Sequence, residues 1–231
     1  MTGTFLNIAT VLIGGSIGLF FGARIPERFK STVIAGMGLF TAGMGLQMFL
    51  KTENPLIVLG ALIIGILLGE WMRIEDRLRS LGETLEKRFA SSGESSTFVR
   101  GFLTASLLFC VGPMTILGSI QDGLTGDYSL LAIKSTLDFF AALAFASTLG
   151  VGVLFSALVI LVFQGGISLA AGALNAIITI PMLNELTATG GVLLLGLAVS
   201  SLLEIKPIRV GNFLPALAIA PLIVWVIERL K

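Results

Sequence analysis

Long apolar stretches alternate with short polar connections along almost the whole chain. A membrane-spanning helix needs roughly 20 consecutive apolar residues. Stretches of about that length recur from one end to the other, so the pattern predicts an all-α, polytopic transmembrane helical bundle of about eight spans, forming one domain over residues 1–231. The predicted spans are residues 5–23, 31–50, 55–72, 98–121, 128–149, 153–174, 186–203 and 210–227.

The fourth of these spans is interrupted. Phe98–Val111 is too short to cross a membrane alone, and Gly112-Pro113 follows directly. Proline inside a helix removes a backbone hydrogen bond and frees a carbonyl that needs a partner in protein or water. Two alternatives stay open from the sequence: a kinked span that continues to Gln121, or a re-entrant segment.

Residues 73–89 differ from the rest because they are strongly charged. Their apolar residues recur every three or four positions, and Glu75/Arg79 and Glu83/Lys87 form i,i+4 pairs in the favourable order. This pattern predicts an amphipathic cytoplasmic helix that lies on the membrane surface or continues the third span. Residues 90–97 are rich in Ser and Gly and are expected to form a flexible linker.

Composition confirms the bilayer as the solvent and excludes several functions. The 231 residues are 55% hydrophobic and only 13% charged, with a mean hydropathy of +0.99. A net charge of +1 gives no basic surface for nucleic acid. The chain has no His and a single cysteine, Cys110, so we expect no enzyme activity, no disulfide, no bound cofactor and no metal cluster. The first charge is Arg24, so residues 1–23 are expected to be a retained span rather than a cleaved signal.

The distribution of basic residues predicts the orientation. With eight spans, the loops on one side carry nearly all of them, whereas the other side carries only Lys51, Arg229 and Lys231. Basic loops stay in the cytoplasm. We therefore expect both termini on the outer side of a bacterial inner membrane, with Asp122 and Asp127 near the outer face. The basic residues on the predicted cytoplasmic side are Arg24, Arg28, Lys30, Arg73, Arg77, Arg79, Lys87, Arg88, Arg100, Lys206 and Arg209.

A weak internal repeat relates the two ends of the chain. Gly15 corresponds to Gly166, 151 positions later, and Pro55 corresponds to Pro207, 152 positions later. Spans one to three (residues 5–78) thus resemble spans six to eight (residues 153–230), on either side of the helix and linker at 73–97 and a central polar segment at 98–149. Because the partner spans are five apart, an odd number, the two copies are expected to be inverted. Inverted repeats are common in transporters, with the site at the repeat interface.

The candidate site centres on two ionisable residues inside the fifth span. Lys134 and Asp138 are one helical turn apart, and ionisable groups in a span usually mark a pathway or a paired site. A purely structural ion pair is the alternative. A carboxylate beside a cation is a poor proton carrier and a better ligand for a cation or substrate, so we expect any bound ion to be monovalent, such as Na⁺ near Asp138.

The broken segment supplies the other candidate ligands. Its freed carbonyls and polar side chains suit either a hard cation or an anionic substrate group, whereas a capped kink is the structural alternative. Two amides elsewhere, Asn7 and Gln164, are expected on the walls of the same water-accessible cavity or as links between helices. The full set of candidate substrate- or ion-binding residues is Asn7, Gly112, Pro113, Thr115, Ser119, Gln121, Asp122, Lys134, Asp138 and Gln164.

The central motif resembles a known family. The run Phe109-Cys-Val-Gly-Pro-Met-Thr-Ile-Leu-Gly-Ser-Ile-Gln-Asp-Gly-Leu-Thr-Gly-Asp127, followed by Lys134-Ser-Thr-Leu-Asp138, is similar to the bacterial integral-membrane family called domain of unknown function 554, the YdfK/YqgA-like proteins. The similarity extends over essentially the whole chain and departs from it at Pro113, where a small residue is expected. It implies a bacterial inner-membrane protein and brings no function with it.

The sequence therefore favours a small secondary transporter or ion-coupled carrier of a small solute. An oligomeric channel, in which the same groups line a passive pore, is the first alternative. A membrane scaffold that binds a partner through residues 73–89 is the second. Expected partners are the lipid bilayer, an unidentified small solute or ion and further copies of the chain, with no nucleic acid.

Overall fold

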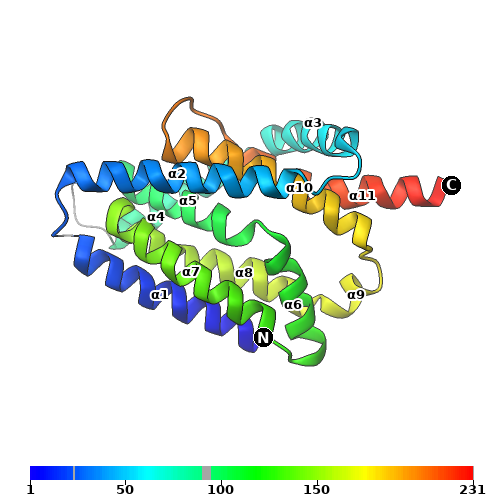
Figure 1. Cartoon of the computed structure of the whole chain (residues 1–231), viewed down its shortest axis with the longest axis horizontal. Helices are drawn as coiled ribbons and strands as arrows, with labels where there is room; N and C mark the ends of the chain where they lie inside the picture. Colours follow the sequence, from blue (N-terminus) through cyan, green and yellow to red (C-terminus); the bar gives the residue numbers. More distant parts are fainter. Residues whose placement is uncertain (23, 90–94, 231) are drawn as a thin grey trace. The chain divides into compact units, whose positions relative to one another are not determined.

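The computed structural model describes residues 1–22, 24–89 and 95–230, and within these ranges every regular element is helical (Figure 1). The all-α prediction is thereby confirmed. Seven helices are long and apolar enough to cross a membrane, and a bent pair brings the number to eight if it counts as one span. The elements are α1 (Thr2–Gly22), α2 (Glu27–Phe49), α3 (Pro55–Met72), α4 (Ile74–Phe89), α5 (Ser95–Cys110), α6 (Pro113–Thr125), α7 (Ser129–Leu149), η1 (Val151–Phe155), α8 (Ser156–Leu169), α9 (Ala171–Asn175), α10 (Ile180–Leu197), η2 (Ala198–Leu202), η3 (Val210–Phe213) and α11 (Pro215–Leu230).

The chain forms two compact units that each combine distant parts of the sequence. Unit 1 contains residues 1–36 and 79–176, and unit 2 contains residues 37–78 and 177–231. Unit 1 therefore holds α1 and α5 to α9, while unit 2 holds α3, α10 and α11. The division into two repeat copies, residues 5–78 and 153–230, remains a prediction.

In unit 1, α1 and α7 lie side by side and run in the same direction (Figure 1). Four glycines of α1 allow this close approach, because a methyl group at any of them would overlap α7. Each meets a residue further along α7 in step with its own position: Gly3 meets Leu131, Gly14 meets Phe139, Gly18 meets Leu143 and Gly22 meets Ser147. The last three contacts are with main-chain carbonyls, so side chains cannot move aside to admit a larger residue.

The helix pair α5–α6 is broken where the sequence predicts it. Gly112 has φ +146°, a conformation open to glycine, and Pro113 begins α6 after a bend of 63°. The start of α5 lies against the end of α7, since Gly101 faces Leu149. Helix α6 lies against the start of α7, since Gly118 faces Leu131. The two halves thus lie against opposite ends of α7, a path that agrees with the kinked-span alternative.

Helix α8 packs against α1 in the opposite direction. A methyl group on Gly165 of α8 would approach Thr4, and one on Gly15 would approach Leu154 of η1, so rising numbers on α1 meet falling numbers along the span formed by η1 and α8. This span, residues 151–169, ends earlier than the predicted 153–174, because α8 stops at Leu169 and the short helix α9 follows.

Unit 2 is built around two antiparallel helix contacts. Gly45 of α2 and Gly191 of α10 approach each other's main chain, and Gly65 of α3 meets the backbone of Ala216 in α11. Buried Ile57, Met182 and Val224 form a small apolar core that Ile223, Trp225 and Ile227 extend. Burying these side chains against one another fixes how the helices of unit 2 pack.

Several boundaries differ from the sequence prediction for local reasons. Residues 175–184 do not all form a connection, because Thr179 caps α10 and Pro181 sits in its first turn. Pro215 likewise starts α11 instead of breaking a span, and only Pro221 lies inside that helix. Arg73 adopts a left-handed conformation that ends α3, so α4 does not continue that span in a straight line.

The amphipathic helix α4 is confirmed as a helix. Its Gly82 faces Phe102 and Val99 of α5, and Leu81 remains 45% exposed. Of the predicted linker, residues 90–94 lie outside the described residues, and residues 95–97 belong to α5.

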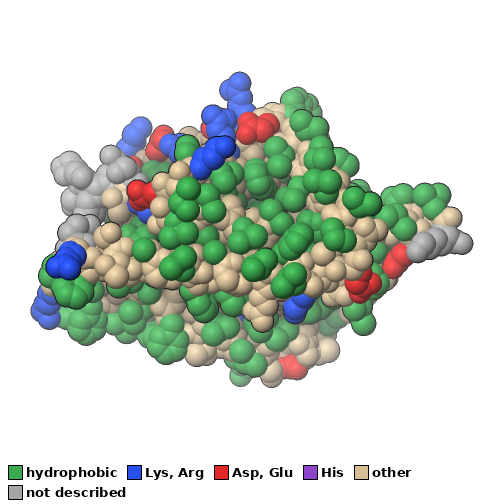
Figure 2. All heavy atoms as spheres, turned by 45° about the horizontal axis from the view of Figure 1, so that its top comes forward, with side chains coloured by type: hydrophobic (Ala, Val, Ile, Leu, Met, Phe, Trp, Pro, Cys, Tyr) green, Lys and Arg blue, Asp and Glu red, His purple; other side chains and the backbone are tan. Residues whose placement is uncertain are grey.

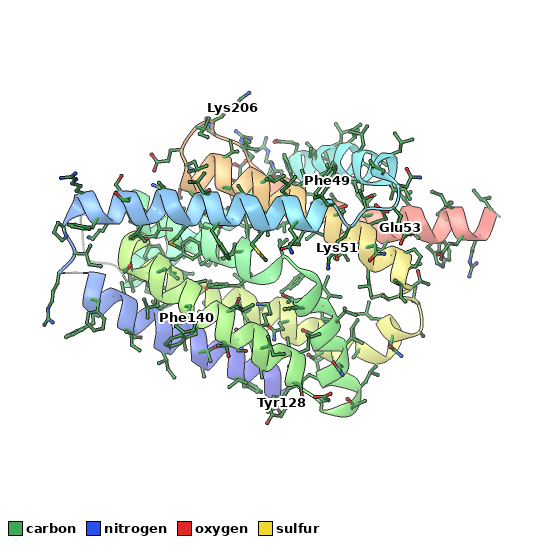
Figure 3. The ribbon with its side chains drawn as sticks, in the orientation of Figure 1. Phe49, Lys51, Glu53, Tyr128, Phe140 and Lys206 are labelled. Carbon is green, nitrogen blue, oxygen red and sulfur yellow. The ribbon has the colours of Figure 1, made fainter. Side chains whose placement is uncertain are left out.

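The exposed surface agrees with a lipid environment. Hydrophobic side chains are spread widely over the face shown in Figure 2, among backbone and other side chains. Phe140, on α7 in Figure 3, is 62% exposed, and Leu137 on the same helix is 57% exposed. In water such residues would be costly, whereas in a bilayer they face lipid tails.

Candidate functional site

The predicted Lys134–Asp138 pair lies on the buried side of α7 in unit 1. The ammonium of Lys134 donates to the Asp138 carboxylate, and the two side chains are only 8% and 11% exposed. Lys134 Nζ also lies 6.0 Å from the centre of the Phe109 ring on α5. Burying one of these charges without the other would be costly, so each stabilises the other in place.

An amide of α1 joins this pair to α8. Asn7 donates from Nδ2 to Gln164 Oε1 at 3.0 Å, and its side chain also lies beside the Asp138 carboxylate. Asn7 Oδ1 and Gln164 Nε2, both fully buried, have no partner among the described residues. The network thus presents one unused acceptor and one unused donor inside the membrane.

Asp122 belongs to α6, and its side chain lies beside the start of α1. Its Oδ2 accepts a hydrogen bond from the Gly3 amide at 3.1 Å and lies 3.2 Å from the Met1 amine. The residue is 2% exposed, and its other oxygen, Oδ1, has no partner in the part of the chain that the structure describes. A buried carboxylate oxygen without a donor is costly.

The remaining polar residues of the broken segment are placed differently from one another. Thr115 and Ser119 are buried, but their hydroxyls donate to the carbonyls of Phe109 and Thr115. Gly112 and Pro113 form the helix break itself. Gln121 lies apart from the buried network, because its exposed amide donates to Asp127 at 3.0 Å.

Asp127 serves the connection between α6 and α7. Its carboxylate accepts from both the hydroxyl and the amide of Ser129, and these hydrogen bonds hold the pKa of the carboxyl below its usual value. It is fully exposed, so its role is to cap the loop rather than to bind a solute.

The comparisons with known proteins agree with this architecture. The family model described as "Protein of unknown function (DUF554)" matches residues 2–225. This chain belongs to that family. It is 32% identical to the uncharacterized membrane protein YdfK of Bacillus subtilis (strain 168) over 232 residues, 99% of this chain and 97% of that protein. It is 33% identical to the uncharacterized protein YqgA of Escherichia coli (strain K12) over 222 residues, 94% of each chain. No solved structure matches this chain.

Membership of DUF554 confirms the resemblance predicted from the central motif and leaves the site to be argued from geometry. Sequence reasoning missed Thr4 and left Ser168 and Ser135 out of the site. All three are buried in this DUF554 protein, and within residues 1–22, 24–89 and 95–230 their hydroxyls have no hydrogen-bond partner. A single hydroxyl in an apolar span does not indicate a binding site, since most such hydroxyls donate to a carbonyl of their own helix.

Sequence reasoning also missed Glu185, a carboxylate of α10 in unit 2 that is 2% exposed. It accepts from the Thr52 hydroxyl at 2.6 Å and from the Glu53 and Asn54 amides at 2.9 and 3.0 Å. These groups form the loop before α3, where Figure 3 labels Glu53. The carboxylate is fully used, so it holds the start of α3. Its position in an otherwise apolar stretch was the available signal.

Proposed function

We propose that this DUF554 protein is a small secondary carrier that moves a small solute across the bacterial inner membrane, coupled to a monovalent cation. The site is the polar network of unit 1 formed by Asn7, Gln164, Lys134 and Asp138. The observation that carries the proposal is the unused acceptor and donor beside a buried ion pair. Ionisable groups inside a membrane are costly and usually functional.

The packing of the predicted repeat partners supports a carrier design. Span one packs antiparallel to span six within unit 1, as α1 against α8. Within unit 2, span two packs antiparallel to span seven and span three to span eight, as α2 against α10 and α3 against α11. An inverted repeat whose two-fold axis lies in the membrane plane would pair its helices in this way.

The buried state of the site favours a carrier over a channel. Counted over the whole residue, Asn7 and Gln164 are 0% exposed, and Lys134 and Asp138 are 6% and 8% exposed. A passive pore needs a continuous wet path, whereas a carrier encloses its site in at least one state. The proposed topology has eight spans, including the kinked α5–α6, with both termini outside, because this arrangement leaves the basic loops in the cytoplasm.

Transport in proteoliposomes tests this function. An imposed Na⁺ or proton gradient would drive saturable uptake, with a panel of radiolabelled zwitterionic amino acids and ²²Na⁺ as probes. We expect Asp138→Asn to reduce the gradient-driven rate by at least about tenfold, as expected when about 1.4 kcal/mol of binding is lost. Asp127→Asn, which alters only the exposed loop, is the matched control. Flux that is passive and does not saturate would support the channel alternative and contradict the carrier.

A further inference from the structure

Three helices of unit 1 meet at one level, each through a glycine. Gly3 of α1 donates its amide to Asp122 of α6. Gly123 of α6 lies against the main-chain carbonyl of Ser168 in α8. Gly165 of α8 faces α1, where a methyl group would come within 4.0 Å of Thr4. The three pairwise contacts close a triangle of α1, α6 and α8.

Each helix of this triangle contributes an oxygen without a partner among the described residues. These are Thr4 Oγ1 from α1, Asp122 Oδ1 from α6 and Ser168 Oγ from α8. The three residues are 0%, 2% and 4% exposed. Asn7 Oδ1, one turn further along α1, is a fourth such oxygen. Asp122 Oδ1 and Asn7 Oδ1 can only accept, and neither of the two hydroxyls donates to them.

Several other hydroxyls of the helices are paired, whereas those of Thr4 and Ser168, like those of Thr104, Ser106 and Ser135, have no partner among the described residues. Those of Ser119, Thr136, Thr148 and Thr189 each donate to a carbonyl one turn back in their own helix. Ser168 has the carbonyl of Gln164 at the same spacing but makes no such bond among the described residues. Its hydroxyl is therefore available to a ligand between the helices.

We propose that this triangle is a sodium site, with Asp122 Oδ1, Thr4 Oγ1 and Ser168 Oγ as ligands and Asn7 Oδ1 on its inner side. Carboxylate, amide and hydroxyl oxygens are the ligands that hard cations take. The only full charge in the set is negative. The other oxygen of this carboxylate, Oδ2, is occupied by the Met1 amine and the Gly3 amide, so Oδ1 is the oxygen that remains for an ion.

This location differs from the sodium ion expected near Asp138. The Asp138 carboxylate lies beside the Lys134 ammonium and the Asn7 side chain, as Asp122 Oδ2 lies beside the Met1 amine and the Gly3 amide. Asp122 keeps its second oxygen, Oδ1, without a partner among the described residues. Asn7 lies beside Asp138 and one turn from Thr4 on α1, so it stands between the two places. It would link ion binding to the buried pair.

Thermal unfolding of the purified full chain in detergent tests the site. A ligand that binds only the folded state raises Tm with its concentration. We expect Tm to rise in NaCl and not in KCl or choline chloride at the same ionic strength. Asp122→Asn should abolish the rise, and Asp127→Asn should keep it. Thr4→Val and Ser168→Ala should each raise the half-saturating Na⁺ concentration by about tenfold, the loss of one good polar contact. Should Asp122→Asn fail to fold, these two variants and ²²Na⁺ binding decide.

Two results would overturn the sodium site: no Na⁺-specific stabilisation, or stabilisation that all three site variants retain. The role of the ion rests on the proposed carrier function, but the two can fail separately. Uptake driven by a proton gradient with no Na⁺ effect would contradict the sodium site and support the carrier. Na⁺ binding at Asp122 without transport under either gradient would contradict the carrier and support the sodium site.

Discussion

At the scale of single residues, the cost of charge in a membrane decides what Lys134 and Asp138 can do. Each side chain is nearly buried, and its only full opposite charge among the described residues is the other. Asn7 and Phe109 add a neighbouring amide and a ring face, but no compensating charge. The pair is therefore a unit, and single substitutions should harm it more than a double one.

The first prediction concerns this pair. Lys134→Met and Asp138→Asn should each lower the unfolding free energy by about 3–5 kcal/mol, because each leaves the full charge of the other residue unpaired. The double variant should recover most of that stability, because no unpaired charge remains. Thermal unfolding in detergent measures all four proteins. A double variant no more stable than the worse single variant would show that the groups are not coupled.

The second prediction concerns the glycines of α1. Gly18→Ala should destabilise the protein by about 1–3 kcal/mol, because its methyl group would overlap the Leu143 carbonyl of α7. Gly36→Ala is the matched control, since nothing lies within 4 Å of that position and alanine favours a helix by up to about 1 kcal/mol. Equal effects of the two substitutions on Tm would contradict the close packing of α1 on α7.

At the scale of elements, carboxylates hold the loops that begin two helices of unit 2. Glu185 accepts from the loop before α3. Glu75 accepts from the Gly211 amide at 2.6 Å, while its own amide donates to Asn212 Oδ1 at 2.8 Å, before α11. Such bonds satisfy backbone groups that a helix start leaves free. A short polar loop can thereby begin a span at a fixed place.

The third prediction follows from Glu185. Glu185→Ala should cost about 1.5–3 kcal/mol, since it leaves a hydroxyl and two amides without their charged acceptor. Glu53→Ala, at an exposed residue that accepts only from Asn184, should change stability by no more than about 0.5 kcal/mol. Hydrogen exchange at the amides of Glu53 and Asn54 should quicken in the Glu185 variant. Unchanged exchange there would contradict a role in holding this loop.

At the scale of the whole molecule, the direction of the helices constrains the number of crossings. Helices α1 and α7 are parallel. Parallel spans have an odd number of crossings between them, and α2, α3 and the kinked α5–α6 supply three. A re-entrant α5–α6 would leave two crossings and make α7 antiparallel to α1. The packing within unit 1 thus supports the eight-span topology independently of the charge distribution.

The fourth prediction concerns the orientation of the chain, with α4 in the cytoplasm and the end of α6 outside. On a Cys110→Ser background, Ser80→Cys in α4 should react with a membrane-impermeant thiol reagent only after the membrane is opened. Thr125→Cys, at the end of α6, should react from outside. Both residues are exposed, so access depends on the side of the membrane. Labelling of Ser80→Cys in sealed cells would reverse the proposed orientation.

The sequence by itself determined the class of the protein and most of its spans. Stretches near 20 apolar residues need lipid around them, so residues 55–72 and the break at Gly112-Pro113 could be located without coordinates. The Lys134–Asp138 pair was also predictable, because a one-turn spacing within one helix fixes which groups meet.

Only the tertiary structure decided which oxygens share a site. Gln121 and Asp122 are neighbours in sequence, yet Gln121 is exposed and Asp122 is buried beside α1, because successive helix positions face about 100° apart. Thr4 and Ser168 became candidates only when three glycine contacts brought α1, α6 and α8 together. Such contacts depend on packing between distant segments, which the local pattern of a single chain does not encode.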